Sequence, residues 1–217
     1  MDRSRKQEAY DYLKQAILSN QLVQGAPISE LAVSEALKMS RTPIREALRD
    51  LEHEGLVVSY PARGSFVKVI TPLDIEEIYE LRLLLEGWAL ERSIKHITSR
   101  DLEQIEKIFH TGLENQDWAM IHNADRELHK LIIDKCGSKR LAEFIDILNG
   151  QTEHIRYTSA AHTERMGSSY EEHLDLLRAI RERNLQQAQD ALRNHLLSVS
   201  KSAATVLRFG GVGDHQV

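Results

Sequence analysis

The chain has 217 residues and a mass of 24.8 kDa, a length that allows one large domain or two small ones. Mean hydropathy is -0.40 and no run approaches about 18 apolar residues, which excludes a membrane-spanning helix. The single cysteine, Cys136, excludes an intrachain disulfide and a cysteine-based zinc finger. Together with the lack of an apolar signal segment at the start, it predicts a cytoplasmic protein. The net charge of -5 argues against a protein that simply coats nucleic acid.

Charge and proline are distributed unevenly. Residues 1–70 hold 10 basic and 9 acidic side chains, whereas the remaining residues hold 18 basic and 24 acidic ones. All four prolines lie in the first 72 residues, and a long proline-free stretch suits a helical array. We therefore predict one domain over residues 1–70, a second over 71–208 and a disordered tail over 209–217.

The first domain is expected to contain three helices followed by a hairpin. Apolar residues recur at helical spacing in three segments, and Gly55 ends the third of them. Two β-rich runs follow, joined by a turn at residues 61–64. The predicted helices span 4–20, 29–37 and 42–54, and the predicted strands span 56–60 and 65–69. This order is that of a winged helix-turn-helix.

The third helix carries a row of arginines. Arg41, Arg45 and Arg49 are four residues apart and so share one face. Arginine reads guanine edges in the major groove of DNA, although a run of charges is more often a solvated face. The short helix pair, the Ser40 N-cap and the following hairpin all agree with the first interpretation. We therefore predict binding to double-stranded DNA.

Residues 40–52 read SRTPIREALRDLE and are followed by Glu54-Gly55-Leu56. This string resembles the signature of the GntR family of bacterial transcription regulators. The resemblance implies that the helix arginines reach bases or phosphates, that the flanking hydroxyls lie near the backbone, and that the hairpin tip enters the minor groove. The positions that it assigns to DNA are Ser40, Arg41, Thr42, Arg45, Arg49, Arg63 and Gly64. Leu31 departs from the family pattern, which often has a polar or charged residue there.

The second domain is predicted to be entirely helical. Its helical segments span 71–95, 99–114, 117–135, 138–159, 164–182 and 185–207. Short connections between them predict an antiparallel bundle of six to seven helices. The fold class is therefore mainly α, with an N-terminal winged helix-turn-helix and a C-terminal helix bundle.

Four ligand-type side chains fall on apolar stripes of these helices. Asp125 and His129 are four residues apart on one helical face. His173 and His195 each lie 11 residues from a turn near residue 184, so an antiparallel helix pair brings them to similar height. A shared divalent cation such as zinc, nickel or manganese would satisfy all four. The alternative is four polar residues that are each satisfied separately.

The same region resembles the FCD ligand-binding domain of the FadR subfamily within GntR. Residues 125–129 match its Asp-x-x-x-His motif, and the stretches ending in His173 and around His195 match its two later histidine positions. The resemblance implies that Asp125, His129, His173 and His195 hold a metal, zinc first and nickel or manganese as alternatives. It also implies that a small carboxylate effector completes the coordination.

Two arginines are candidate effector ligands. Arg82 matches a family arginine that points into the pocket, and Arg156 lies on the fourth bundle helix. A guanidinium pairs well with a carboxylate. The alternative for Arg82 is a structural salt bridge with Glu80 or Glu86.

These observations predict an effector-responsive DNA-binding regulator. The resemblance implies a homodimer on a pseudo-palindromic operator and a repressor released by its carboxylate. A metal-sensing regulator is one alternative. A metalloenzyme is another, because Asp plus three His leaves open metal positions. No base or nucleophile stands at a fixed offset from the ligands, and an enzyme would not explain the arginine-rich helix, so we predict neither an enzyme nor a membrane partner.

Overall fold

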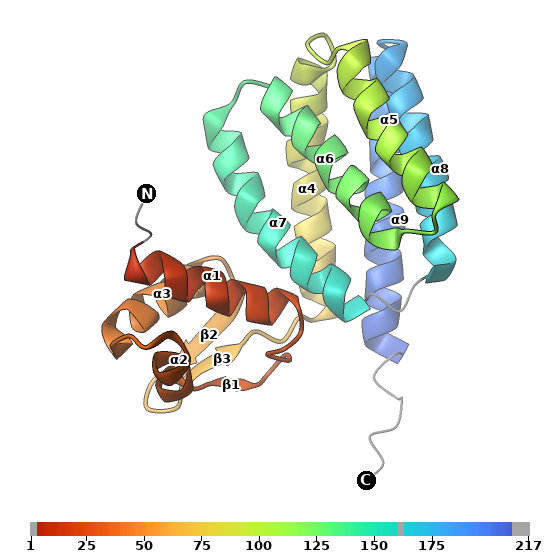
Figure 1. The fold of residues 1–217 in the computed structure, drawn as a ribbon. Coiled ribbons are helices and arrows are strands. Elements are labelled where there is room, and N and C mark those ends of the chain that lie inside the picture. The colour runs from red at the N-terminus through yellow and green to blue at the C-terminus, as the bar shows by residue number, and fades with distance from the viewer. Residues whose placement is uncertain (1–3, 160–162, 210–217) are drawn as a thin grey trace. The chain divides into compact units, whose positions relative to one another are not determined.

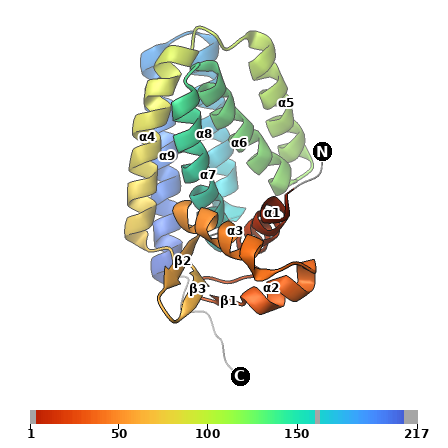
Figure 2. The same ribbon diagram turned by 90° about the vertical axis from the view of Figure 1, so that its left-hand side faces the viewer.

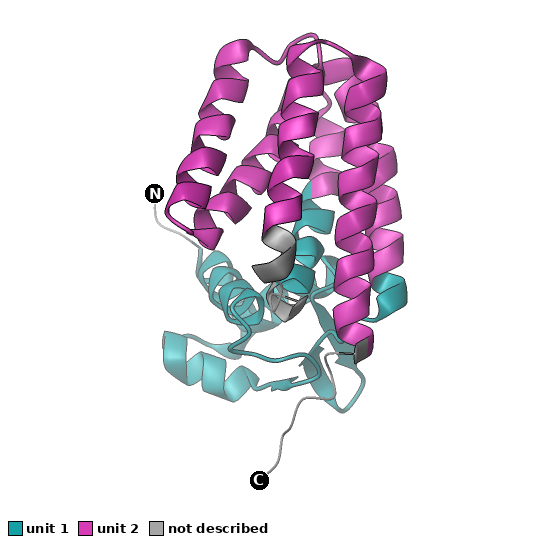
Figure 3. Ribbon diagram, turned by 90° about the vertical axis from the view of Figure 1, so that its right-hand side faces the viewer, with its two compact units in different colours: residues 1–74, 146–160 teal, residues 75–145, 161–217 magenta. Residues whose placement is uncertain are grey.

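The computed structural model describes residues 4–159 and 163–209 (Figure 1). The chain divides into two compact units (Figure 3). Unit 1 comprises Met1–Asp74 and Asp146–Ala160, and unit 2 comprises Ile75–Ile145 and Ala161–Val217. The predicted fold class, mainly α with a winged helix-turn-helix and a helix bundle, is confirmed. Of the tail predicted over 209–217, Phe209 ends the last helix and the rest lies outside the described residues.

The described part of unit 1 up to Asp74 contains three complete helices and a small sheet (Figure 2). The helices are α1 (Arg5–Leu18), α2 (Glu30–Leu37) and α3 (Arg41–His53), and the strands are β1 (Pro27–Ile28), β2 (Val57–Tyr60) and β3 (Gly64–Val67). The strands are antiparallel in the order β1-β3-β2. The sequence did not predict β1, because two residues are too few to show a strand period, and Pro27 reads as a break. Proline is tolerated there because β1 lies at the edge of the sheet.

Helix α3 is held in place by its apolar side. Ile44, Ala47, Leu48 and Leu51 are buried at the helical spacing that the sequence shows, and they join a core with α1 and the sheet. Ser40 occupies the N-cap position as predicted, but its side chain makes no capping hydrogen bond. Burial of one side leaves the opposite side of α3 at the surface.

Unit 2 is built from long helices. They are α4 (Pro72–Ser93, its first residues in unit 1), α5 (Ser99–Glu114), α6 (Trp118–Lys135), α8 (Thr163–Arg181) and α9 (Leu185–Phe209), together with the first residues of α7 (Lys139–Ser159). Thr98 and Asp101 form a reciprocal capping box at the start of α5, and Asp117 caps α6. Helix α8 packs along α9, and α5 packs on α6 and α8 (Figures 1 and 2). None of the helices in the described ranges is long and apolar enough to cross a membrane.

Helix α7 belongs to both units. Its first residues lie in unit 2, and residues 146–159 lie in unit 1. Within unit 1, Nε2 of Gln151 donates a hydrogen bond of 2.8 Å to the carbonyl oxygen of Glu54, the residue that caps α3. The domains predicted from the sequence, residues 1–70 and 71–208, assign the whole of α7 to the second domain and so do not include this division of the helix.

Candidate DNA-binding face and metal centre

The arginine face of α3 lies at the surface. All seven positions assigned to DNA by resemblance are exposed in the structure: Ser40, Arg41, Thr42, Arg45, Arg49, Arg63 and Gly64. The first five follow one another along the start and outer side of α3. This surface therefore has the residue types and the accessibility that a major-groove contact requires.

Arg45 has an acidic partner that the sequence did not reveal. Its Nε lies 3.0 and 2.9 Å from the two carboxylate oxygens of Glu30, the first residue of α2. The two residues are 15 apart on different helices, so no periodic pattern marks the pair. The pair is partly exposed, so its contribution to stability is small, on the order of 0–1 kcal/mol.

The wing tip lies in the turn between β2 and β3. Gly64 has φ +90°, a conformation that L side chains rarely adopt, and no atom lies within 4 Å of the position of a Cβ there. The constraint at this position is therefore backbone strain rather than space. The guanidinium of Arg63 lies 5.7 Å from the centroid of the Tyr60 ring, a cation–π contact that holds the tip arginine beside the strand.

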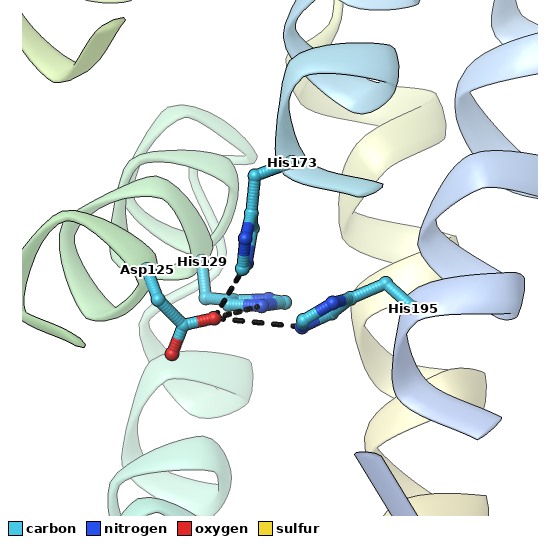
Figure 4. Close-up of side chains that lie close together, drawn as sticks. All are labelled: Asp125, His129, His173 and His195. Carbon is cyan, nitrogen blue, oxygen red and sulfur yellow. Dashed lines mark hydrogen bonds and ion pairs between the residues drawn. The ribbon is translucent and has the colours of Figure 1, made fainter. Parts of the chain in front are cut away.

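The four predicted metal ligands come together in unit 2 (Figure 4). Asp125 and His129 project from α6, His173 from α8 and His195 from α9, and all four are buried. Oδ1 of Asp125 lies 2.7 Å from Nε2 of His173, 3.3 Å from Nε2 of His129 and 3.4 Å from Nε2 of His195. One candidate ligand atom from each residue lies within 4.8 Å of all the others.

The chemistry of this donor set suits a divalent cation. Nε2 of His129 and Nε2 of His195 are buried and have no hydrogen-bond partner among the residues that the structure describes. Unpaired buried nitrogens are costly, and a metal ion would give them a partner. Three imidazole nitrogens and one carboxylate oxygen form a ligand set of the kind that zinc, nickel or manganese accepts.

Two glutamates contact the outer nitrogens of these histidines. Nδ1 of His129 bonds to Glu86 on α4, and Nδ1 of His195 bonds to Glu172 on α8 at 2.9 Å. The sequence did not single out Glu172, although it lies beside His173 in the YEEH stretch. From the sequence, Glu86 was considered only as a possible salt-bridge partner of Arg82. Each glutamate lies on a different helix from the histidine that it contacts, so sequence spacing carries no signal for either pair.

Electrostatics differ among the buried groups. Burial raises the pKa of the Glu86 carboxyl, but Arg82 and His129 outweigh it and lower that pKa to about 2. Burial lowers the pKa of His173 to about 4, with His195 acting in the same direction. Burial also opposes protonation of His129, but the Glu86 and Asp125 carboxylates raise its pKa above the usual value. His129 is therefore the more readily protonated of these two imidazoles.

The structure gives Arg82 the salt bridge that the sequence left open. Its Nε donates to Glu86 at 2.7 Å in the buried interior, and its guanidinium lies 5.5 Å from the centroid of the Tyr79 ring. Arg156 lies in unit 1 and bonds to Glu153 at 3.2 Å.

Comparison with known proteins identifies the chain. Residues 5–67 match the family of bacterial regulatory proteins called the gntR family, and residues 77–198 match the FCD domain. The chain is a GntR-family regulator with an FCD domain. The family resemblance found in the sequence is confirmed, and the family consists of DNA-binding transcription regulators rather than enzymes.

Relatives agree over nearly the whole length of this GntR regulator. It is 27% identical to the transcriptional regulator YdhC of Bacillus subtilis, over 87% of this chain and 84% of that one. It is 26% identical to the HTH-type transcriptional repressor RspR of Escherichia coli K12, over 92% and 89% of the two chains. A GntR regulator from Rhodococcus sp. RHA1 has the same fold, with a TM-score of 0.80, 22% identity and coverage of 94% and 99%. A solved structure described as the metal-free FCD domain of TM0439 matches with a TM-score of 0.59 and 23% identity, over 64% of this chain and 98% of the other.

Proposed function

We propose that this regulator is a cytoplasmic repressor of the FadR subfamily that binds its operator as a homodimer and leaves it when a small carboxylate binds beside a zinc ion. The observation that carries the sensing part is the convergence of three histidine Nε2 atoms on one oxygen of Asp125. The name of the Escherichia coli relative, a transcriptional repressor, supports the sign of regulation.

Asp125, His129, His173 and His195 would hold the metal, with nickel or manganese as alternatives to zinc. A zinc ion with four protein ligands can expand its coordination and offer a position to a carboxylate oxygen. Arg82 remains a candidate effector ligand through its terminal nitrogens, because only its Nε is bonded to Glu86. Arg156 is a second candidate.

The test measures operator binding by zinc-loaded protein in the presence of a panel of small carboxylates. We expect at least one carboxylate to weaken binding about tenfold or more, a coupling of the size typical of allosteric regulators. Release by zinc alone, with no effect of any carboxylate, would instead favour a metal-sensing regulator. That second function is worth testing because the same four side chains would serve it.

Arg45 is proposed to read a base. Replacing Arg45 by alanine should cost about 1–3 kcal/mol of specific binding, because a bidentate contact to guanine is lost. The helix should persist, since alanine is a good helix former. Competition gel shifts with operator and random DNA measure the change, and Arg178→Ala, an exposed arginine on α8, is the control. Unchanged discrimination would show that Arg45 does not read sequence.

Metal affinity should fall as the pH falls. Protons compete with the metal for imidazole nitrogens, and the Glu86 and Asp125 carboxylates raise the pKa of His129, which makes this residue easier to protonate than His173. We expect apparent zinc affinity to decrease from pH 8 toward about pH 6, near the ordinary imidazole pKa. Zinc titration against a chelator at several pH values measures this. An affinity that does not change over that range would contradict histidine ligation.

The dimer contact is proposed to lie on α4. Leu81, Leu84 and Trp88 follow one another at helical spacing in unit 2 and are exposed, Leu84 to 70%. A single recognition helix reads only a few base pairs, so a two-fold operator requires a second copy of the chain. The same face on both copies would make a self-complementary contact.

A further inference from the structure

Two of the four predicted metal ligands, His129 and His195, also contact a glutamate through Nδ1, the second nitrogen of each ring. Nδ1 of His195 lies 2.9 Å from Oε2 of Glu172, and Nδ1 of His129 contacts Oε2 of Glu86. An ionised carboxylate only accepts hydrogen bonds, so in each pair the imidazole donates its Nδ1 hydrogen. A neutral imidazole has one N–H, and Nε2 is then left with its lone pair.

The Nε2 lone pairs of His129 and His195 lie where the four predicted metal ligands meet. Within the described ranges, Nε2 of His129 and Nε2 of His195 are buried without hydrogen-bond partners, and they lie 3.3 and 3.4 Å from Oδ1 of Asp125. We propose that Glu86 and Glu172 are positioning residues, which fix the Nδ1–H tautomer of His129 and His195 and turn both Nε2 atoms toward the metal. This inference rests on the proposed metal site and adds two residues to it.

The third histidine is held in another way. His173 stacks on the ring of Phe109, with centroids 4.9 Å apart and an angle of 27° between the planes. Its Nδ1 is buried and finds no hydrogen-bond partner in the described part of the chain. Packing therefore orients His173, whereas carboxylates orient the other two, and only those two should respond to removal of a glutamate.

Glu172 gives the cleaner test. Its side chain is 21% exposed, whereas removal of the buried Glu86 would leave the buried charge of Arg82 without its ion-pair partner. Three variants of the full-length chain are compared with wild type. Glu172→Ala removes the acceptor, Glu172→Gln keeps an acceptor without the charge, and Glu171→Ala changes the exposed neighbour as a control.

The first measurement is zinc affinity by competition with a chelator. We expect Glu172→Ala to bind zinc about 10–100-fold more weakly, Glu172→Gln to lie between it and wild type, and Glu171→Ala to match wild type. The second measurement is the tautomer of His195 in metal-free protein, from long-range hydrogen–nitrogen NMR correlations. Wild type should show Nδ1–H alone, and Glu172→Ala should show a mixture.

The outcomes separate this inference from the proposed function. Zinc bound by wild type and by Glu172→Ala with equal affinity would overturn the positioning role and leave the metal site standing. An Nε2–H tautomer of His195 in metal-free wild type would overturn it as well. No uptake of zinc, nickel or manganese by wild type would overturn the metal site and, with it, the role of both glutamates.

Discussion

Replacing His173 by alanine is expected to abolish tight zinc binding while leaving operator binding intact. The substitution removes one of four ligands, so affinity should fall by more than the roughly 100-fold upper range for residues that only support a ligand. His173 belongs to unit 2, and the arginine face belongs to unit 1. The variant should therefore still bind DNA but should no longer be released by the effector.

Elemental analysis of protein purified without a metal-affinity column measures the zinc content, and gel shifts with and without effector measure the response. His96→Ala is the matched control, because this histidine is exposed and lies outside the cluster. If His173→Ala keeps stoichiometric zinc, or still responds to the effector, the cluster is not the sensor. It would then be an ordinary buried polar group.

Replacing Leu84 by glutamate is expected to convert the dimer into a monomer. Leu84 is 70% exposed in the single chain, so a charge there should not disturb folding, but in a self-complementary contact two charges would face each other. Loss of the second half-site should lower operator affinity by about 100-fold or more. Light scattering at micromolar concentration measures the mass, and gel shifts measure the affinity.

Leu113→Glu provides the control for this experiment. Leu113 lies on α5, is also exposed, and receives the same change of charge. A Leu84→Glu protein that remains dimeric would place the dimer contact elsewhere. A wild-type protein that is monomeric would contradict the homodimer itself.

The sequence predicted those features of the fold that follow from helical periodicity. The buried row from Ile44 to Leu51 and the arginines on the other side of α3 follow from helical spacing alone, and the structure shows both. His173 and His195 are equally far along the chain from the turn near residue 184. The sequence therefore also predicted that they lie at the same height on the helix pair. The contacts of the arginines with DNA and of the histidines with a metal stay predictions.

The sequence did not predict side-chain contacts between residues that lie on different helices. Glu30 meets Arg45 across two helices, and Glu172 meets His195 across the α8–α9 pair. No spacing rule marks such pairs, because the distance between them depends on how the helices pack. The strand β1 was missed for a different reason, because two residues are too few to show a strand period and Pro27 reads as a break.

The shared helix α7 bears on how such regulators could exchange parts during evolution. Residues 146–160 belong to unit 1, where a Cβ on Gly55 would lie 2.4 Å from Nε2 of Gln151. A recombination event at residue 74 that brought in a foreign effector domain would also replace this larger part of α7. The foreign domain would then have to supply a side chain that fits against Gly55, in addition to its own ligand site. Functional chimeras of this protein should therefore arise more readily when residues 146–160 are inherited together with residues 1–74.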